Sequence, residues 1–84
     1  MYYVYILRSI KERKLYIGFT GDLKRRFHEH KDGLVNSTKQ WLPVELIYYE
    51  AYKDAKDARE RERKLKHFKR SYMELRKRIH YSTG

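Results

Sequence analysis

The runs of apolar residues along the chain predict three strands. Residues 2–8 (YYVYILR) are apolar or aromatic at nearly every position, which is typical of a strand that is covered on both faces. Residues 15–20 form a second segment of this kind, and the short polar stretch between the two suits a hairpin turn. Antiparallel pairing of these strands would bring Tyr5 and Tyr16 close together. Residues 44–52 are aromatic and β-branched, and they predict a third strand.

Apolar residues at helical spacing predict a helix directly after the second strand. Leu23 and Phe27 stand one turn apart and predict a helix over residues 22–31. Asp22 is a suitable N-cap for it, and Gly33 is a suitable residue to end it. The helix and its two boundaries are therefore all indicated by local signals.

Two further helices are expected after the third strand. Residues 54–68 place Ala58 and Leu65 on one helical face. Ser71 and Glu74 have the spacing of a capping box, which predicts that the last helix starts near Ser71. The order of elements is therefore ββαβαα, in one compact α/β unit without repeats or interdomain linkers.

Polar side chains interrupt the apolar stripes of two of these helices. At about 100° per residue, Arg26 and His30 fall on the apolar face of the first helix. Glu62 falls on the apolar face of the second. Burial of an unpaired charge costs of the order of several kcal/mol, so polar partners are expected to face both helices. Taken singly, each of these residues is also explained by an ordinary ion pair or a packed histidine.

The composition limits the class of protein. A chain of 84 residues forms a single domain, residues 1–84, with a small core. It contains no cysteine, which excludes disulfides, thiolate metal sites and thiol catalysis. The sequence shows neither a signal peptide nor a long apolar segment, so a cytoplasmic protein is expected.

The charge predicts a polyanionic partner. Lys and Arg number 21 against 11 for Asp and Glu, which gives a formal net charge of +10. On a domain of this size such a charge favours nucleic acid as the partner. A membrane surface is disfavoured, because the basic helices lack a bulky apolar face. The cations expected to contact a nucleic-acid backbone are Lys24, Arg25, Lys39, Lys64, Lys66, Lys69 and Arg70.

The segment before the third strand has no periodic pattern. Residues 34–42 (LVNSTKQWL) mix hydroxyl and amide groups with Lys39 and Trp41. Such a segment is either a plain connector or a surface loop beside a phosphate backbone, and the sequence favours neither interpretation.

A set of residues in a fixed order resembles the GIY-YIG nuclease superfamily. Tyr3-Val4-Tyr5 is followed after ten residues by Tyr16-Ile17-Gly18, and the pattern continues with Thr20, Asp22, Leu23, Arg25, Arg26, His30 and Glu62. The resemblance covers residues 2–68 and is strongest to the small single-domain members. The chain departs from the pattern at Tyr3 and Val4, where the family has glycine and isoleucine. The late asparagine of the longer nucleases has no counterpart after Glu62.

The resemblance implies both a fold and a chemistry. The fold would be a three-stranded antiparallel sheet flanked by helices, and the site would hydrolyse phosphodiester bonds where two tyrosines, an arginine and a glutamate meet. In that site Glu62 would bind one Mg²⁺ or Mn²⁺ ion, and Arg26 would hold the scissile phosphate. Tyr5 or Tyr16 would orient or deprotonate the attacking water. His30 would shuttle a proton or bind phosphate.

The sequence therefore predicts a metal-dependent, structure- or backbone-selective endonuclease that acts on DNA in repair or recombination. The alternative is a non-catalytic nucleic-acid-binding protein that keeps the nuclease fold. A third possibility is a basic accessory protein of a ribonucleoprotein. RNA stays open as a substrate, and so do the choice of tyrosine that activates the water and the use of a homodimer or a targeting partner.

Overall fold

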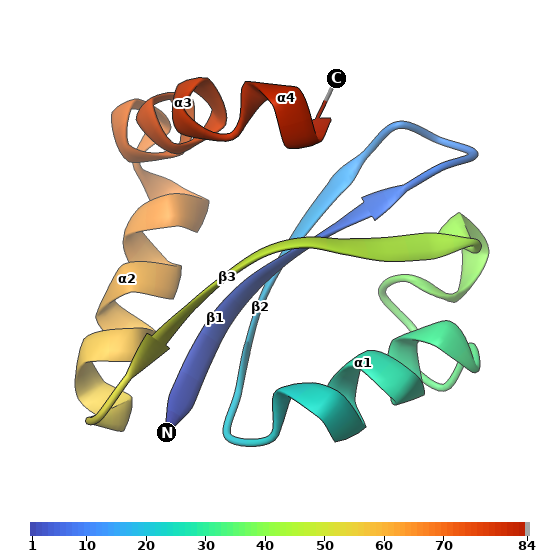
Figure 1. The fold of residues 1–84 in the computed structure, drawn as a ribbon, viewed down its shortest axis with the longest axis horizontal. Helices are drawn as coiled ribbons and strands as arrows, with labels where there is room; N and C mark the ends of the chain where they lie inside the picture. The colour runs from blue at the N-terminus through green and yellow to red at the C-terminus, as the bar shows by residue number, and fades with distance from the viewer. Residues whose placement is uncertain (84) are drawn as a thin grey trace.

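The centre of the fold is a three-stranded antiparallel sheet, as predicted. In the computed structural model, which describes residues 1–83, the strands are β1 (Tyr2–Ser9), β2 (Leu15–Thr20) and β3 (Val44–Tyr52). Their spatial order is β2-β1-β3, so the apolar first strand lies in the middle of the sheet (Figure 1). This position explains why β1 is apolar on both faces, since helices cover it from both sides.

A β-bulge in β3 sets which side chains of that strand face each layer. Ile6 pairs with Tyr48 and Leu7 pairs with Leu46, so Ile47 is an extra residue on β3. Ile47 and Tyr48 consequently pack on the same side of the sheet, with Ile6. Leu46 packs on the opposite side, with Leu7. The shift allows one strand to supply side chains to both hydrophobic layers.

One face of the sheet is covered by helix α1 (Leu23–Lys31) and the short 3-10 helix η1 (Lys39–Trp41). Tyr5 and Leu7 of β1 are buried in this layer. The half-buried residues packed against them are Tyr16, Leu23, Phe27, Trp41, Leu42 and Leu46. The aperiodic segment 34–42 thus contributes to the core through its last residues.

Helix α1 starts and stops where the local signals predict. The side chain of Asp22 accepts a hydrogen bond from the backbone N–H of Arg25 at 3.0 Å, which is the expected N-cap contact. Gly33 has a φ of +76°, the left-handed conformation that favours glycine after a helix. The backbone carbonyl of Glu29 then accepts from the N–H of Leu34 at 3.0 Å. These contacts fix the direction in which α1 crosses the sheet.

The opposite face is covered by helices α2 (Ala55–His67), α3 (Lys69–Arg78) and α4 (His80–Thr83). Val4 and Ile6 of β1 are buried on this side. The buried helical residues that contact them are Ala58, Leu65, Leu75 and Ile79. The sheet therefore has two separate hydrophobic layers, one on each face.

The predicted start of the last long helix is wrong. Helix α3 begins at Lys69, and its N-cap position is taken by Phe68, which makes no side-chain capping bond. Phe68 has an extended backbone conformation that ends α2 and lets the chain turn at once into α3. Ser71 therefore lies inside the helix, and Glu74 pairs with Arg70 at 3.3 Å instead of closing a capping box. The short η1 and α4 helices were not predicted either.

A half-buried carboxylate joins α2 to the outer strand β3. Glu50 accepts hydrogen bonds from the hydroxyls of Tyr48 and Tyr52, both at 2.5 Å, and from Nε of Arg61 at 2.9 Å. Burial opposes ionisation of Glu50, but Arg61 and the two hydroxyls hold its pKa below the usual value. The carboxylate thus stays charged and fixes the angle of α2 on the sheet.

None of the helices in residues 1–83 combines the length and the apolar character that crossing a bilayer requires.

Candidate active site

The ring of Tyr5 lies directly against the backbone of Gly18. These two residues face each other across β1 and β2. A Cβ atom added to Gly18 would lie 2.3 Å from Cζ of Tyr5 and 2.4 Å from its hydroxyl oxygen. No side chain fits there, so this position inside β2 requires glycine. Its absent side chain lets the Tyr5 ring cross the neighbouring strand.

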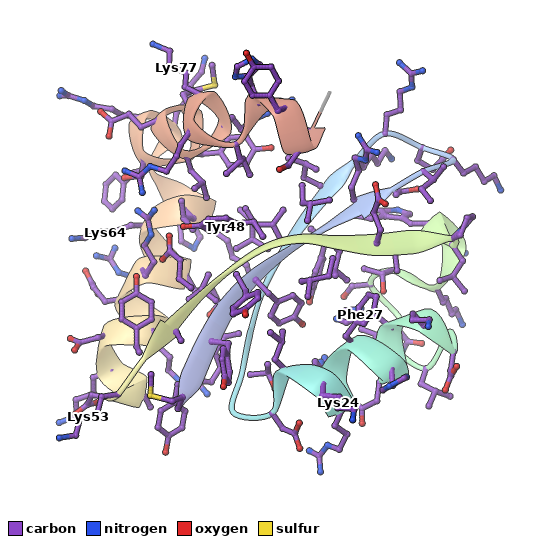
Figure 2. The ribbon with its side chains drawn as sticks, viewed as in Figure 1. Lys24, Phe27, Tyr48, Lys53, Lys64 and Lys77 are labelled. Atoms are coloured by element: carbon purple, nitrogen blue, oxygen red, sulfur yellow. The ribbon has the colours of Figure 1, made fainter. Side chains whose placement is uncertain are left out.

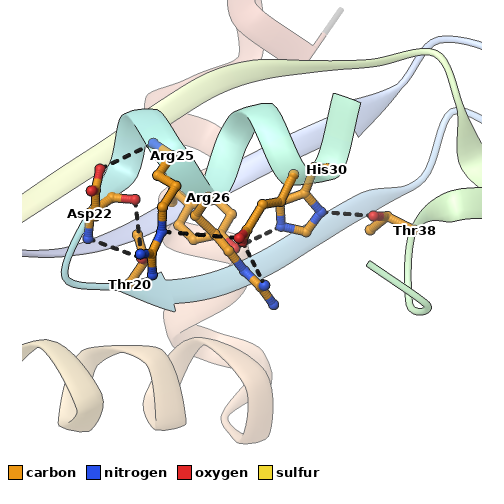
Figure 3. A network of polar contacts seen from close by, with 8 residues as sticks. Thr20, Asp22, Arg25, Arg26, His30 and Thr38 are labelled. Carbon is orange, nitrogen blue, oxygen red and sulfur yellow. Dashed lines mark hydrogen bonds and ion pairs between the residues drawn. The ribbon is translucent and has the colours of Figure 1, made fainter. Parts of the chain in front are cut away.

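The hydroxyl of Tyr5 begins a buried chain of hydrogen bonds. Its oxygen lies 2.8 Å from Nε2 of His30, and Nδ1 of His30 lies 2.7 Å from Oγ1 of Thr38. The contacts around His30 and Thr38 are drawn in Figure 3. Tyr5 is 1% exposed, and His30 and Thr38 are fully buried. Both ring nitrogens of His30 thus have a partner. The hydroxyls of Tyr5 and Thr38 are the polar groups that face His30 on the first helix.

Burial keeps His30 neutral. Desolvation is the main cause that lowers its pKa to about 4, and the nearby charge of Arg26 lowers it further. A neutral imidazole donates through one nitrogen and accepts through the other, so it links the hydroxyls of Thr38 and Tyr5 in one chain. The ring has no exposed surface for contact with a phosphate.

The second tyrosine of the pattern lies beside the first, as predicted. The ring centroids of Tyr5 and Tyr16 are 6.3 Å apart. Tyr16 also meets the edge of His30 at 5.2 Å and of Trp41 at 6.4 Å. Because Tyr16 is only half-buried, it forms the outer surface of an aromatic cluster whose inner member is Tyr5.

The environment of Tyr5 keeps its hydroxyl protonated. Burial raises the pKa of Tyr5 to about 12, and the neighbouring Tyr16 and Glu62 add to this increase. The guanidinium of Arg26 acts in the opposite direction without cancelling it. Both Arg26 and Glu62 therefore influence the pKa of Tyr5.

Arg26 finds its partner on its own helix. Its Nη1 lies 3.1 Å from Oε1 of Glu29, and the side chain of Arg26 is 37% exposed. Sequence reasoning missed Glu29, although an acid three residues after an arginine on a helix is a recognisable pairing signal. The arginine is therefore anchored but still accessible from solvent.

Glu62 lies on helix α2, and its charge acts on the pKa of Tyr5. Its carboxylate is 19% exposed and lies 3.0 Å from Nζ of Lys66, one turn later. Residues 1–83 contain no group of three or more His, Asp or Glu side chains arranged to hold a metal ion. A divalent ion bound by Glu62 would therefore take its other ligands from water and substrate, which hard cations such as Mg²⁺ tolerate well.

The surface cations expected to bind nucleic acid do not form one patch. Lys24 and Arg25 belong to α1, whereas Lys64 and Lys66 belong to α2 on the other side of the sheet. Figure 2 shows Lys24 and Lys64 projecting from separate sides of the molecule. Lys39 lies in η1, beside the buried Thr38. Lys69 and Arg70 open helix α3.

Thr38 is a second site residue, besides Glu29, that the sequence did not identify. It lies in the aperiodic segment, where no spacing distinguishes an inward-facing hydroxyl from an outward-facing one. Only the contact with His30, eight residues earlier, shows its function in the site.

A family model and several known proteins are similar to this chain over most of its length. The family model described as the GIY-YIG catalytic domain matches residues 1–77. A UPF0213 protein of Clostridium perfringens is 36% identical over 72 residues, which are 84% of this chain and 76% of the relative. A UPF0213 protein of Streptococcus pyogenes serotype M3 is 42% identical over 57 residues, which are 67% of this chain. That match spans 60% of the streptococcal protein, less than two thirds of its length. No solved structure gives a significant match.

Proposed function

Because the chain belongs to the family of GIY-YIG catalytic domains, we propose that it is a metal-dependent endonuclease that hydrolyses phosphodiester bonds of DNA. The family implies a nuclease-type function and a nucleic-acid substrate. The observation that carries the finer proposal is the cluster around Tyr5, whose hydroxyl lies 2.8 Å from Nε2 of His30 and whose ring lies 6.3 Å from that of Tyr16. The charges of Arg26 and Glu62, which act on the pKa of Tyr5, support their assignment to the same site.

Arg26 is proposed to bind the scissile phosphate. Its guanidinium is permanently charged, and its forked N–H groups match the oxygens of a phosphate. The ion pair with Glu29 restricts the side chain before substrate arrives. A positive charge fixed in this way stabilises the additional negative charge of the transition state without reorganisation.

Glu62 is proposed to hold one Mg²⁺ or Mn²⁺ ion. A partly buried carboxylate is the type of oxygen ligand that these ions prefer. When bound, such an ion supplies charge stabilisation at the phosphate. Nζ of Lys66 lies 3.0 Å from Oε2 of Glu62, so this ammonium group must move away when an ion binds to the carboxylate.

We assign contact with the attacking water to Tyr16 rather than to Tyr5. Tyr5 is 1% exposed, its hydroxyl is bound to His30, and its pKa of about 12 keeps it protonated. Tyr16 is half-buried at the outer side of the same aromatic cluster. In this arrangement Tyr5, His30 and Thr38 form a rigid support that fixes the ring of Tyr16 and the position of Arg26.

The proposed target, compartment and cellular process rest on the sequence and on the family. The net charge of +10 supports the nucleic-acid backbone as the target of the surface cations named above. We propose that residues 1–84 act as one domain, in the cytoplasm, in DNA repair or recombination. If both strands are cut, we propose that a homodimer or a targeting partner supplies the second site.

The experiment that tests the proposal is cleavage of labelled duplex, single-stranded, flapped and branched DNA in Mg²⁺, Mn²⁺ or EDTA. Wild type is compared with Glu62→Gln and with Glu60→Gln. Glu60 is a matched control, because it lies on the same helix and is paired with Arg63 at 2.6 Å. We expect metal-dependent cleavage by wild type and Glu60→Gln and none by a folded Glu62→Gln variant.

Equal cleavage by both variants would refute the assignment of Glu62 to the metal. Binding of DNA without cleavage by any of the three proteins, in every metal, would refute the nuclease proposal and favour a non-catalytic binder. Inclusion of RNA versions of the same substrates decides which nucleic acid is cut.

A further inference from the structure

A concave pocket lies outside the candidate active site, between the β1–β2 hairpin turn and helices α3 and α4. Its volume is about 510 Å³, within the range of pockets that hold small molecules or single groups of larger ones. Its walls are mainly cationic and aromatic. The cationic and aromatic residues of its lining are Arg8, Arg13, Lys14, Trp41, Tyr72 and Arg76.

The pocket carries a surplus of positive charge. Arg8 is neutralised, since its Nη2 lies 2.6 Å from Oε1 of Glu45. Within residues 1–83, Arg13, Lys14 and Arg76 make no ion pair with a carboxylate. Three cations around one depression repel each other, so a bound anion would lower the energy of the folded protein.

Two of these cations lie over aromatic rings. Nζ of Lys14 is 5.6 Å from the ring centroid of Trp41, and Cζ of Arg76 is 5.9 Å from that of Tyr72. Both rings are half-buried, whereas both cations are exposed. If the cations turn outward to phosphates, the ring faces become available for a nucleobase. Cations for the backbone and aromatic faces for bases are the two components of sites for single-stranded nucleic acid.

A second depression connects this pocket with the candidate active site. It has a volume of about 330 Å³ and shares Leu15 and Tyr72 with the first pocket. It is also lined by Tyr16 and by Lys66, the partner of Glu62. Moreover, the ring centroids of Trp41 and Tyr16 are 6.4 Å apart. One continuous surface along β2 therefore leads from Tyr16 to the cationic pocket.

We propose that this surface binds a single strand of nucleic acid that extends from the candidate active site. Lys14, Arg13 and Arg76 contact its phosphates, and one base stacks on Trp41 or Tyr72. A duplex offers no free base face to these rings, because its bases are already stacked on one another. The inference rests on the proposed nuclease function for the identity of the adjacent site, but the binding itself does not require cleavage.

The proposed strand-binding surface includes few of the cations that the sequence predicts to contact nucleic acid. Of those seven residues, only Lys66 lines the connecting surface. Arg13, Lys14 and Arg76 were not predicted, because two of them belong to a hairpin turn and the third to a distant helix. A direct comparison of the two sets of cations is therefore informative.

The test is binding of fluorescein-labelled oligo(dT) and oligo(U), each of about twelve nucleotides, measured by anisotropy in EDTA at several salt concentrations. The double variant Lys14→Gln/Arg76→Gln is compared with Lys53→Gln/Lys77→Gln, which removes the same charge from surfaces elsewhere (Figure 2). We expect the first variant to bind at least ~10-fold more weakly and its salt slope to fall by about 1.4, since each single-strand phosphate contact contributes about 0.7. The control should change less than ~3-fold.

Trp41 supplies an independent readout, because it is the only tryptophan of the chain. Stacking of a base on or near this ring should quench its fluorescence on addition of unlabelled oligo(dT). Equal weakening by the two double variants, together with unchanged Trp41 fluorescence, would overturn the proposal. Quenching by free thymidine monophosphate as strong as that by the oligonucleotide would also overturn it, since the site would then bind a nucleotide rather than a strand.

The experiments can refute the strand-binding surface and the nuclease function independently of each other. Binding that depends on Lys14 and Arg76 in a protein that cuts no substrate would support the strand-binding surface and refute the nuclease. Cleavage that is insensitive to these two residues, without quenching of Trp41, would support the nuclease and refute the surface.

Discussion

Replacement of Thr38 by valine tests whether the buried hydrogen-bond chain stabilises the site. The substitution keeps the shape of the side chain and replaces Oγ1, 2.7 Å from Nδ1 of His30, with a methyl group. His30 is fully buried, so water cannot take the place of the lost hydroxyl. An unsatisfied buried polar group costs about 1 to 3 kcal/mol. In a domain of this size, a loss of about 2 kcal/mol lowers Tm by roughly 8 to 16 °C.

The assay is urea denaturation followed by circular dichroism, with Ser37→Ala as the control. Ser37 is the exposed neighbour of Thr38, and its substitution should change the free energy of unfolding by less than about 0.5 kcal/mol. In a His30→Leu background, Thr38→Val should lower the free energy of unfolding much less, because this background lacks the Nδ1 that the substitution would leave unpaired. A Thr38→Val protein with wild-type stability, or an equal cost in both backgrounds, would refute the reasoning.

Three further predictions follow from the same geometry. Gly18→Ala should destabilise the protein by about 1 to 3 kcal/mol in denaturant titrations, because the added Cβ would overlap the buried Tyr5 ring. Gly21→Ala should be nearly neutral in the same assay, since the nearest atom to its Cβ lies 3.7 Å away in Tyr2. The pKa of His30 is lowered from 6.5 to about 4 in the folded state, so the unfolded state binds more protons between these pH values. Up to about 3 kcal/mol of stability should therefore be lost as pH falls from 6.5 to 4. The loss should disappear in His30→Leu and persist in His28→Gln. Arg26→Ala should lower kcat of DNA cleavage by at least ~100-fold, while Arg25→Ala should mainly raise KM; equal effects on kcat would refute the assignment of the phosphate to Arg26.

Local sequence patterns were sufficient for most of the secondary structure. The apolar run of β1, the N-cap at Asp22 and the glycine at position 33 are signals contained within a few neighbouring residues, and the structure confirms each of them. The capping-box prediction at Ser71 failed for a physical reason. The extended backbone of Phe68 ends α2 and places the N-cap of α3 three residues before Ser71, so that motif is not used.

The candidate site was predictable only in part. Periodicity identified Arg26, His30 and Glu62 as polar residues on apolar faces, but it could not supply their surroundings. The hydroxyl that meets His30 belongs to Tyr5, 25 residues earlier in the chain. Whether that histidine lies buried and neutral or exposed and charged follows from the packing of α1 on the sheet.

The sequence by itself determined the strands, the first helix, the net charge and the family resemblance, because periodicity, turn chemistry and residue spacing are local properties. The tertiary structure decided which tyrosine is buried, which hydroxyl holds His30 and where cations gather. Lys14 and Arg76 lie 62 positions apart yet line one pocket, since α3 packs beside the β1–β2 hairpin. Contacts of this kind depend on strand register and helix packing, which no short segment encodes.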